Sequence, residues 1–314
     1  MIESKTPLYE VLTGLFGRTP SVATTAEDVE AQAEKELRAL VKDRAQEVNF
    51  SGEQNADVCD HIFDYNPIHR SAEAAKAFQF GKFKERPIVG PLIIGTAQRV
   101  AEATFRDIRD YFGLEEIQNL VVGTKTKFRN PAYPDQKVKF DVIDCKESGG
   151  NVVLAVAVTS GRDKIAQVDV LVGPRYRQMP EIGGPIHSEV YEIPQEVING
   201  LNKCIGFEEG RVSPFNGAAL VPSALLFMLK ERTGSMVGGN LAMETSYLGM
   251  PTAGRYQVDI MPPRNIREAS RFTLGALVTQ ETAPIAYTMI KAATPETLKL
   301  ERDARQFKRF LYRT

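Results

Sequence analysis

A run of small and apolar residues decides the fold of this chain: Arg86-Pro87-Ile88-Val89-Gly90-Pro91-Leu92-Ile93-Ile94-Gly95-Thr96-Ala97. Proline fits the first position of a helix, where its missing N–H is not needed, so the run predicts a helix that begins near Pro91. The apolar character continues at Val100, Ala101, Ala103, Phe105 and Ile108. A helix that is apolar on most of its sides has to be enclosed by other elements. We therefore expect a buried central helix wrapped by a sheet.

Four strand-like segments follow this helix in quick succession. They are Leu120 to Phe128, Lys137 to Cys145, Val152 to Ser160 and Ile165 to Val172. Apolar and polar residues alternate from Lys137 to Val142, and turn residues such as Gly149 and Gly150 separate the runs. Closely spaced strands joined by short turns predict an antiparallel meander. The fold class is therefore α+β, with a sheet curled around one helix.

The segment before the central helix is predicted to be mainly helical. Residues Ala26 to Gln46 are rich in Glu, Ala, Lys and Leu and predict a helix, and Ala45 to Phe50 can form a short first strand. Further helices are expected from Asn55 to Phe63 and from Ala72 to Phe80, the latter with Ser71 as its N-cap. Between them, Pro67 pushes Asn66 toward extended geometry, which predicts a loop.

The same order of elements recurs in the second half of the chain. After a linker from Pro180 to Pro185, the stretch from Ser213 to Pro222 opens a second apolar helix that includes Leu225 to Leu229. Strand-like runs then follow at Asn240 to Leu248, Arg255 to Ile260, Arg271 to Thr279 and Ala286 to Lys291. The repeat favours a duplication over two unrelated α+β stretches that look alike. We divide the chain into a helical extension (1–48), a first half (49–179) and a second half (180–314).

Composition argues against several classes of protein. Of the 314 residues, 43% are hydrophobic and the formal net charge is -1, so charge gives no argument for binding nucleic acid or a membrane surface. Cys59, Cys145 and Cys204 are widely spaced and odd in number, which indicates neither a disulfide framework nor a zinc knuckle. The sequence contains no secretory signal, P-loop, GxGxxG, HExxH or GxSxG pattern. We expect a cytoplasmic protein without a bound metal.

One local cluster of charge lies near the end of the sequence. It consists of Arg302, Arg305, Lys308, Arg309 and Arg313. A solvated helix face is the common reason for such a cluster. The alternative is a cradle for an anionic group such as a CoA phosphate.

The loop Asp64-Tyr65-Asn66-Pro67-Ile68-His69 gathers the residues that can carry chemistry. The chain has 3 histidines, and His69 alone lies beside a carboxylate and an amide in a loop stiffened by proline. Imidazole, with an unperturbed pKa of about 6.5, suits proton transfer near neutrality, and a carboxylate can orient it or share a water with it. From the residues alone, the simpler interpretation is that Asp64 and Asn66 are turn residues and His69 precedes a helix.

This loop resembles the hydratase motif of the MaoC-like dehydratase family, which includes R-specific enoyl-CoA hydratases. That family has Asp, then Asn-Pro, then His at this spacing, followed by an alanine-rich helix and a glycine at the head of the central helix. Here the alanine-rich helix is Ala72 to Ala77 and the glycine is Gly90. The likeness covers the chain from Phe50 to Val172. It implies a double hot-dog fold, in which each half is a long central helix wrapped by an antiparallel sheet.

The resemblance implies a role for each of these residues. Asp64 and His69 would hold one water, add it to C3 of a trans-2-enoyl thioester and deliver a proton to C2; the reverse reaction is a dehydration. Asn66 would support the loop, and the Gly90 N–H would polarise the thioester carbonyl from a helix N-terminus. No cofactor is implied beyond the CoA or acyl carrier protein that carries the acyl group. The two halves are expected to pair within one chain, and a homodimer of whole chains is left open.

The chain departs from the family pattern at three positions. Many relatives have an acidic residue where Ser71 stands and a histidine where Val89 stands, and Pro91 has no N–H to pair with that of Gly90. These departures keep two alternatives open. One is an acyl thioesterase, and the other is a non-catalytic acyl-CoA-binding protein.

The second half has no copy of the loop motif, so we expect it to be non-catalytic. Its Asn216-Gly217 matches the helix head of the first half. The small and apolar residues from Ala218 to Val221 would line space for an acyl chain, or simply fill the core.

Overall fold

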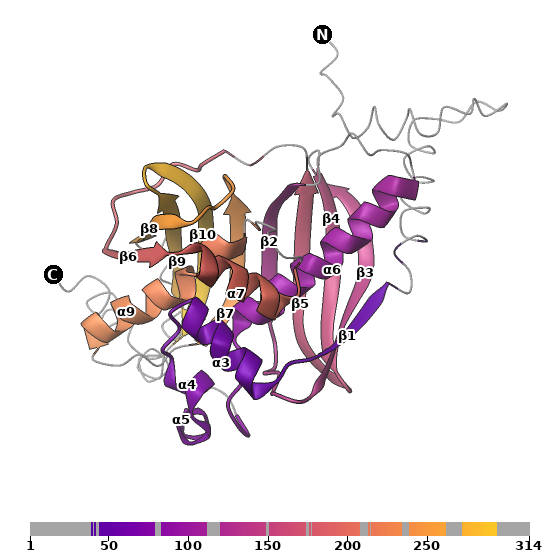
Figure 1. The fold of residues 1–314 in the computed structure, drawn as a ribbon, viewed down its shortest axis with the longest axis horizontal. Coiled ribbons are helices and arrows are strands. Elements are labelled where there is room, and N and C mark those ends of the chain that lie inside the picture. Colours follow the sequence, from indigo (N-terminus) through magenta and orange to yellow (C-terminus); the bar gives the residue numbers. More distant parts are fainter. Residues whose placement is uncertain are drawn as a thin grey trace, which may run out of the picture.

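The computed structural model describes residues 39, 41, 44–78, 83–111, 120–148, 151–173, 176, 178–207, 213, 215–233, 239–261 and 272–293. Most of the helix predicted from Ala26 to Gln46 lies outside these residues, and so does the basic cluster of Arg302, Arg305, Lys308 and Arg309. The described residues form one antiparallel sheet of 10 strands with helices packed against it (Figure 1). None of the described helices is long and apolar enough to cross a membrane.

The first half of the chain contributes five strands and a long helix. Its elements are β1 (Ala45–Asn49), α3 (Gly52–His61), α4 (Pro67–Arg70), α5 (Ala72–Ala77), α6 (Gly90–Tyr111), β2 (Leu120–Phe128), β3 (Lys137–Ser148), β4 (Asn151–Ser160) and β5 (Asp163–Gly173). The central helix predicted near Pro91 begins one residue earlier, at Gly90. The strands predicted after it are all present, and β2 has the predicted ends.

The second half repeats this order. Its elements are β6 (His187–Ile193), α7 (Gln195–Ile205), α8 (Phe215–Ala218), α9 (Val221–Thr233), β7 (Gly239–Tyr247), β8 (Gly254–Met261), β9 (Phe272–Gln280) and β10 (Ala283–Ala293). The sequence predicted the last helix and the last four strands but neither β6 nor α7. The predicted second helix also differs at its head, because α8 is a separate turn that ends before α9 begins.

The order of strands across the sheet reveals an internal symmetry. It reads β1-β3-β4-β5-β2-β7-β10-β9-β8-β6, so the second half repeats the order of the first in mirror image about the β2–β7 pair. These two strands join antiparallel from Gly123 opposite Ser246 to Lys127 opposite Ala242. The duplication and the α+β fold class, a double hot-dog, are therefore confirmed. The division of the chain at residue 179 remains a prediction.

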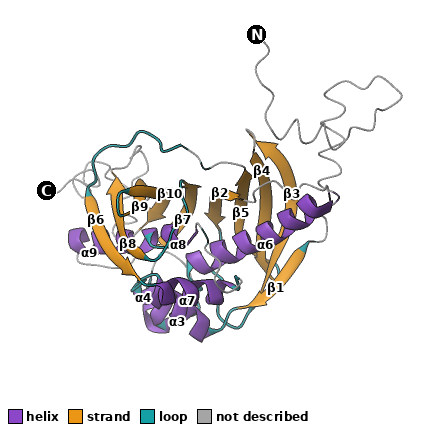
Figure 2. Cartoon of the chain, turned by 45° about the horizontal axis from the view of Figure 1, so that its top comes forward, coloured by secondary structure: helices purple, strands orange, loops and turns teal. Residues whose placement is uncertain are grey.

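Each half of the sheet curves around its own helix (Figure 2). Leu92, Ile93 and Ala97 of α6 are fully buried, and α6 packs on β5, β3, β4 and β2. Helix α9 packs on β8 and β6, while α3 and α7 pack on each other between the two halves. The apolar surface of α6 is thus covered on most sides, which is the enclosure that its sequence required.

The loop predicted from Asp64 to His69 is shorter than expected. Pro67 begins a single helical turn, α4, because the Asn66 side chain caps it and proline is tolerated at the first helical position. Ser71 caps the next helix as predicted, with its hydroxyl accepting from the Ala74 N–H at 3.2 Å. That helix ends at Ala77 rather than Phe80, because Phe78 takes an extended conformation.

Candidate active site

The way in which α3 ends sets the position of Asp64. The Phe63 N–H donates to the Asp60 carbonyl at 3.2 Å and the Asp64 N–H to the Cys59 carbonyl at 2.7 Å. These paired bonds form a helix C-terminus that usually carries glycine where Phe63 stands. Phe63 adopts the left-handed conformation, with φ 56°, which costs a residue with a side chain about 1–2 kcal/mol. The Phe63 ring packs on that of Tyr191, with ring centroids 5.2 Å apart.

The residues after Asp64 form a compact turn that carries His69. Asp64 is only 2% exposed, and its Oδ1 accepts the Asn66 N–H at 2.9 Å. Asn66 is also buried, and its Oδ1 accepts the Ile68 N–H at 3.3 Å. The His69 N–H donates to the Asn66 carbonyl at 3.1 Å. The backbone and the two polar side chains therefore fix His69 and Asp64 on one short segment.

The tautomer of His69 follows from its hydrogen bond. Its Nδ1 lies 2.9 Å from the Pro87 carbonyl oxygen. A carbonyl oxygen can only accept, so Nδ1 carries the proton and donates. In the neutral ring, Nε2 is then the atom with a free lone pair. His69 is half-buried, so part of the residue remains accessible.

Asn55, on α3, ties this turn to the head of the central helix. Its side chain is fully buried; Oδ1 accepts the Val89 N–H at 2.8 Å, and Nδ2 donates to the Pro87 carbonyl at 3.3 Å. Pro87 therefore receives hydrogen bonds from both Asn55 and His69. Sequence analysis missed Asn55. The available signal was its spacing: Asn55 stands three and four residues before the apolar Val58 and Cys59, on the buried face of α3.

Gly90 stands at the first position of α6 with its N–H available. Asn55 binds the Val89 N–H, Pro91 has none, and the Leu92 N–H donates to the Val89 carbonyl at 3.1 Å. The Gly90 N–H has no hydrogen-bond partner among the residues that the structure describes. A β-carbon at Gly90 would lie 3.0 Å from Cζ of Phe128, which is tighter than an ordinary contact. The glycine therefore keeps the helix head clear.

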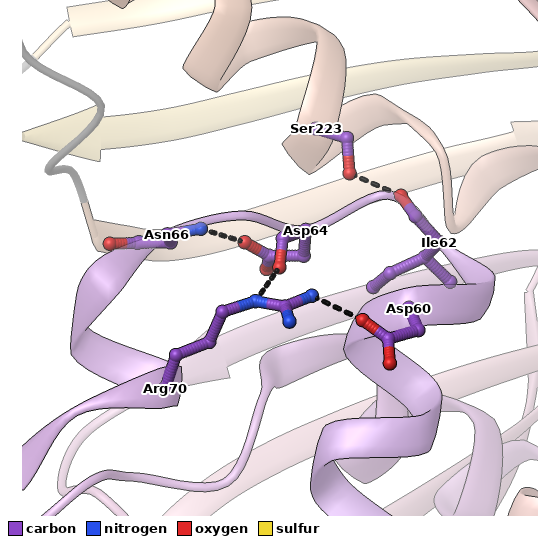
Figure 3. A network of polar contacts seen from close by, with 6 residues as sticks. All are labelled: Asp60, Ile62, Asp64, Asn66, Arg70 and Ser223. Atoms are coloured by element: carbon purple, nitrogen blue, oxygen red, sulfur yellow. Dashed lines mark hydrogen bonds and ion pairs between the residues drawn. The ribbon is translucent and has the colours of Figure 1, made fainter.

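Arg70 supplies positive charge on the other side of the turn (Figure 3). Its Nε donates to the Asp64 carbonyl at 3.0 Å, and its Nη2 pairs with Asp60 Oδ1 at 2.7 Å. Burial opposes the charged guanidinium, but the hydrogen bond and charge of Asp60, with smaller contributions from Cys59 and Asp64, raise the pKa of Arg70 above its ordinary value. Arg70 also lies over the Tyr65 ring, 5.1 Å from its centroid.

The second half of the chain packs directly on this turn. Ser223, at the start of α9, donates its hydroxyl to the Ile62 carbonyl (Figure 3). The Tyr65 and Phe227 rings meet edge to face, with centroids 6.2 Å apart. Together with the Phe63–Tyr191 contact, these interactions place Asp64 at the junction of the two halves.

The structure thus brings four of the predicted site residues into one region. Asp64, Asn66 and His69 share a turn, and Pro87 and Asn55 link that turn to Gly90. The four basic residues from Arg302 to Arg309 lie outside the described residues. Within the described part of the chain, no three His, Cys, Asp or Glu side chains are grouped as metal ligands.

A groove of about 680 Å³ lies mainly on the outer face of the sheet, and its lining also includes Phe128, the residue that faces Gly90. It spans neighbouring rows of β5, β2, β7 and β10, including Lys125, Lys127, Glu244 and Met289. Strand residues alternate between the two faces of a sheet, so the exposed Lys125 and Lys127 point away from α6, toward which the buried Thr124 and Thr126 point. Most of the groove therefore lies on the face of the sheet opposite the candidate active site.

Solved structures of similar shape share the fold at very low sequence identity. A MaoC-like dehydratase matches with a TM-score of 0.56 at 9% identity, covering 82% of this chain and 99% of its own. A MaoC-like dehydratase from Phytophthora capsici matches with a TM-score of 0.50 at 9% identity, covering 80% and 95%. A 12:0-ACP thioesterase from Umbellularia californica reaches 0.50 at 9% identity, covering 66% and 87%. No protein-family model and no curated protein sequence matches the chain.

Proposed function

We propose that this chain reversibly hydrates trans-2-enoyl thioesters to 3-hydroxyacyl thioesters. One observation carries the proposal: the hydrogen bond from His69 Nδ1 to the Pro87 carbonyl, at 2.9 Å. It commits the imidazole to the tautomer with a basic Nε2 and ties that ring to the segment that leads into Gly90.

The chemistry follows from the groups present. A water held between Asp64 and His69 Nε2 would add its oxygen to C3 while His69 accepts one of its protons. The electron pair of the C2–C3 bond would move toward the thioester carbonyl, and negative charge would build on its oxygen. The proton would then pass to C2, which completes the addition of one water. No other reactant is required.

The Gly90 N–H is suited to the developing enolate oxygen. It is the first N–H of α6, where the helix dipole favours negative charge. A single donor of this kind is worth about 3 kcal/mol of barrier, and positioned acid–base groups about 10²–10⁴-fold in rate. The absence of an N–H on Pro91 makes Gly90 the donor at this helix head.

The burial of Asp64 is consistent with this role. A site that excludes water strengthens the interactions of charges within it. The Asn66 N–H and the nearby Arg70 guanidinium provide compensation for a buried carboxylate. The acyl group would reach Asp64 from the side of His69, which is the more exposed of the two.

An absorbance assay tests the proposal directly. Crotonyl-CoA and a longer enoyl-CoA would be mixed with the protein while the enoyl band and free thiol are both recorded. Loss of the enoyl band without thiol release supports hydration. Thiol release instead would identify a thioesterase, and the absence of both would leave an acyl-CoA-binding protein.

A further inference from the structure

Tyr191 carries a buried hydroxyl that has no hydrogen-bond partner among the described residues. The residue is 6% exposed, while its neighbours Val190 and Glu192 on β6 are exposed, so its side chain points into the protein. Its hydroxyl makes no hydrogen bond to any residue that the structure describes. A buried polar group without a partner costs about 1–3 kcal/mol, and native proteins keep few of them. An unpaired hydroxyl of this kind therefore requires an explanation.

The position of Tyr191 offers an explanation for its unpaired hydroxyl. Its ring packs against Phe63, the residue before Asp64, although β6 belongs to the other half of the chain. The Ser223 bond to the Ile62 carbonyl holds the same two parts together. The hydroxyl thus lies beside the turn that carries Asp64 and His69.

The phenol stays protonated in this setting. Burial first, and then the negative charges of Glu189 and Asp64, raise the pKa of Tyr191 well above its ordinary value. Near neutrality it is a hydrogen-bond donor and does not act as a base. A donor beside a carboxylate can hold an oxygen atom between the two.

We propose that the Tyr191 hydroxyl hydrogen-bonds the oxygen at C3 of the substrate, which is the added water or the 3-hydroxyl group. This inference rests on the proposed hydration. It gives the second half of the chain a direct contact with the reacting atoms, although that half lacks the Asp-x-Asn-Pro-x-His motif.

Tyr256 provides a matched control. It lies directly opposite Tyr191 on the neighbouring strand β8 and is 1% exposed. Its hydroxyl, in contrast, donates to the Thr252 carbonyl. The two tyrosines therefore share a strand pair and a degree of burial but differ in whether the hydroxyl has a partner.

The test compares Tyr191→Phe with Tyr256→Phe. Removing an unpaired buried hydroxyl should raise the melting temperature, whereas removing a paired one should lower it. Tyr191→Phe should also lower kcat/KM for crotonyl-CoA about tenfold, the usual worth of one hydrogen bond in a site, and Tyr256→Phe should not. A purely structural role for Tyr191 would not make the protein more stable and less active at once.

Binding measurements separate this inference from the proposed function. The affinity for each enantiomer of 3-hydroxybutyryl-CoA would be measured and divided by the affinity for butyryl-CoA. The measurement would be made for wild type and for Tyr191→Phe. A preference for one 3-hydroxy ligand that disappears in the variant supports the Tyr191 contact, even if no turnover is seen. If the variant hydrates crotonyl-CoA at the wild-type rate and keeps the preference for one 3-hydroxy ligand, the Tyr191 contact is refuted. The proposed hydration is then unaffected. A wild-type protein that binds neither ligand, or a Tyr191→Phe variant that is less stable than wild type, also refutes the contact.

Discussion

Replacing Asn55 with alanine tests whether the network between α3 and the head of α6 positions the site. The substitution removes the 2.8 Å acceptor of the Val89 N–H and the 3.3 Å donor to the Pro87 carbonyl. Val89 is buried, so its N–H is left without a partner, at a cost of about 1–3 kcal/mol. Losing the longer hydrogen bond, to the Pro87 carbonyl, adds about 0.5–1 kcal/mol to this cost. The better helix propensity of alanine offsets about 0.5 kcal/mol of it.

The expected loss of stability is therefore about 1–3.5 kcal/mol. At about 2 °C per kcal/mol for a chain of this size, the melting temperature should fall by about 2–7 °C. The activity should fall further than stability explains. With Pro87 and Val89 released, Gly90 and His69 can shift, and a misplacement of about 1 Å can cost about 10²-fold in rate.

Val58→Ala is the control for this experiment. Val58 lies on the same helix and is fully buried, but it belongs to the apolar core. Truncating it should cost a similar amount of stability and leave kcat/KM for crotonyl-CoA near the wild-type value at a temperature where both variants are folded. Equal activities for the two variants would refute the positioning role of Asn55, and an unchanged melting temperature would show that its two hydrogen bonds contribute nothing.

Three further perturbations probe the site and the core. Asp64→Asn and His69→Ala should each lower turnover by about 10²–10⁴-fold with an unchanged far-ultraviolet circular dichroism spectrum, and near-normal turnover in either would exclude the acid–base pair. Gly90→Ala should lower kcat/KM at least about tenfold by crowding the helix head, while Gly217→Ala, which crowds the second half to a similar degree, should not. Burial raises the pKa of Tyr256 to about 12. Because the unfolded phenol ionises near pH 10, this shift should lower stability in urea as the pH rises beyond about 10; the fall should be smaller in Tyr256→Phe, and an identical profile in that variant would contradict the burial of this hydroxyl.

The strands that were predicted correctly are those whose pattern is local. β3 alternates apolar and polar residues from Lys137 to Val142, β4 is a nearly continuous apolar run, and turn residues separate most of the strands. β6 was missed because its inward positions include His187 and Glu189, which a hydrophobic pattern assigns to the surface. These polar residues are accommodated because His187 binds Glu189 at 2.9 Å and Glu231 at 2.8 Å.

The residues of the candidate site also fall into two groups: those that a local sequence motif predicts and those that it does not. Asp64, Asn66 and His69 are close in sequence, so their motif could be recognised before their geometry was known. Asn55 meets Val89 across 34 positions of the chain, and Tyr191 reaches Phe63 from the other half. Such contacts depend on how α3, α6 and β6 pack, which no local pattern contains.

The unfavourable features of this region argue together for a functional site. Stability alone would favour glycine at position 63, where φ is positive, and phenylalanine at position 191, where the hydroxyl has no partner among the described residues. It would also favour an uncharged residue at the buried position of Asp64. Each departure costs free energy, and all three meet at the junction of the two halves. Strain and unpaired polar groups persist where they serve binding or catalysis. A turn that merely connected two helices would have no reason to keep them, so their coincidence favours a substrate site over a structural role for this loop.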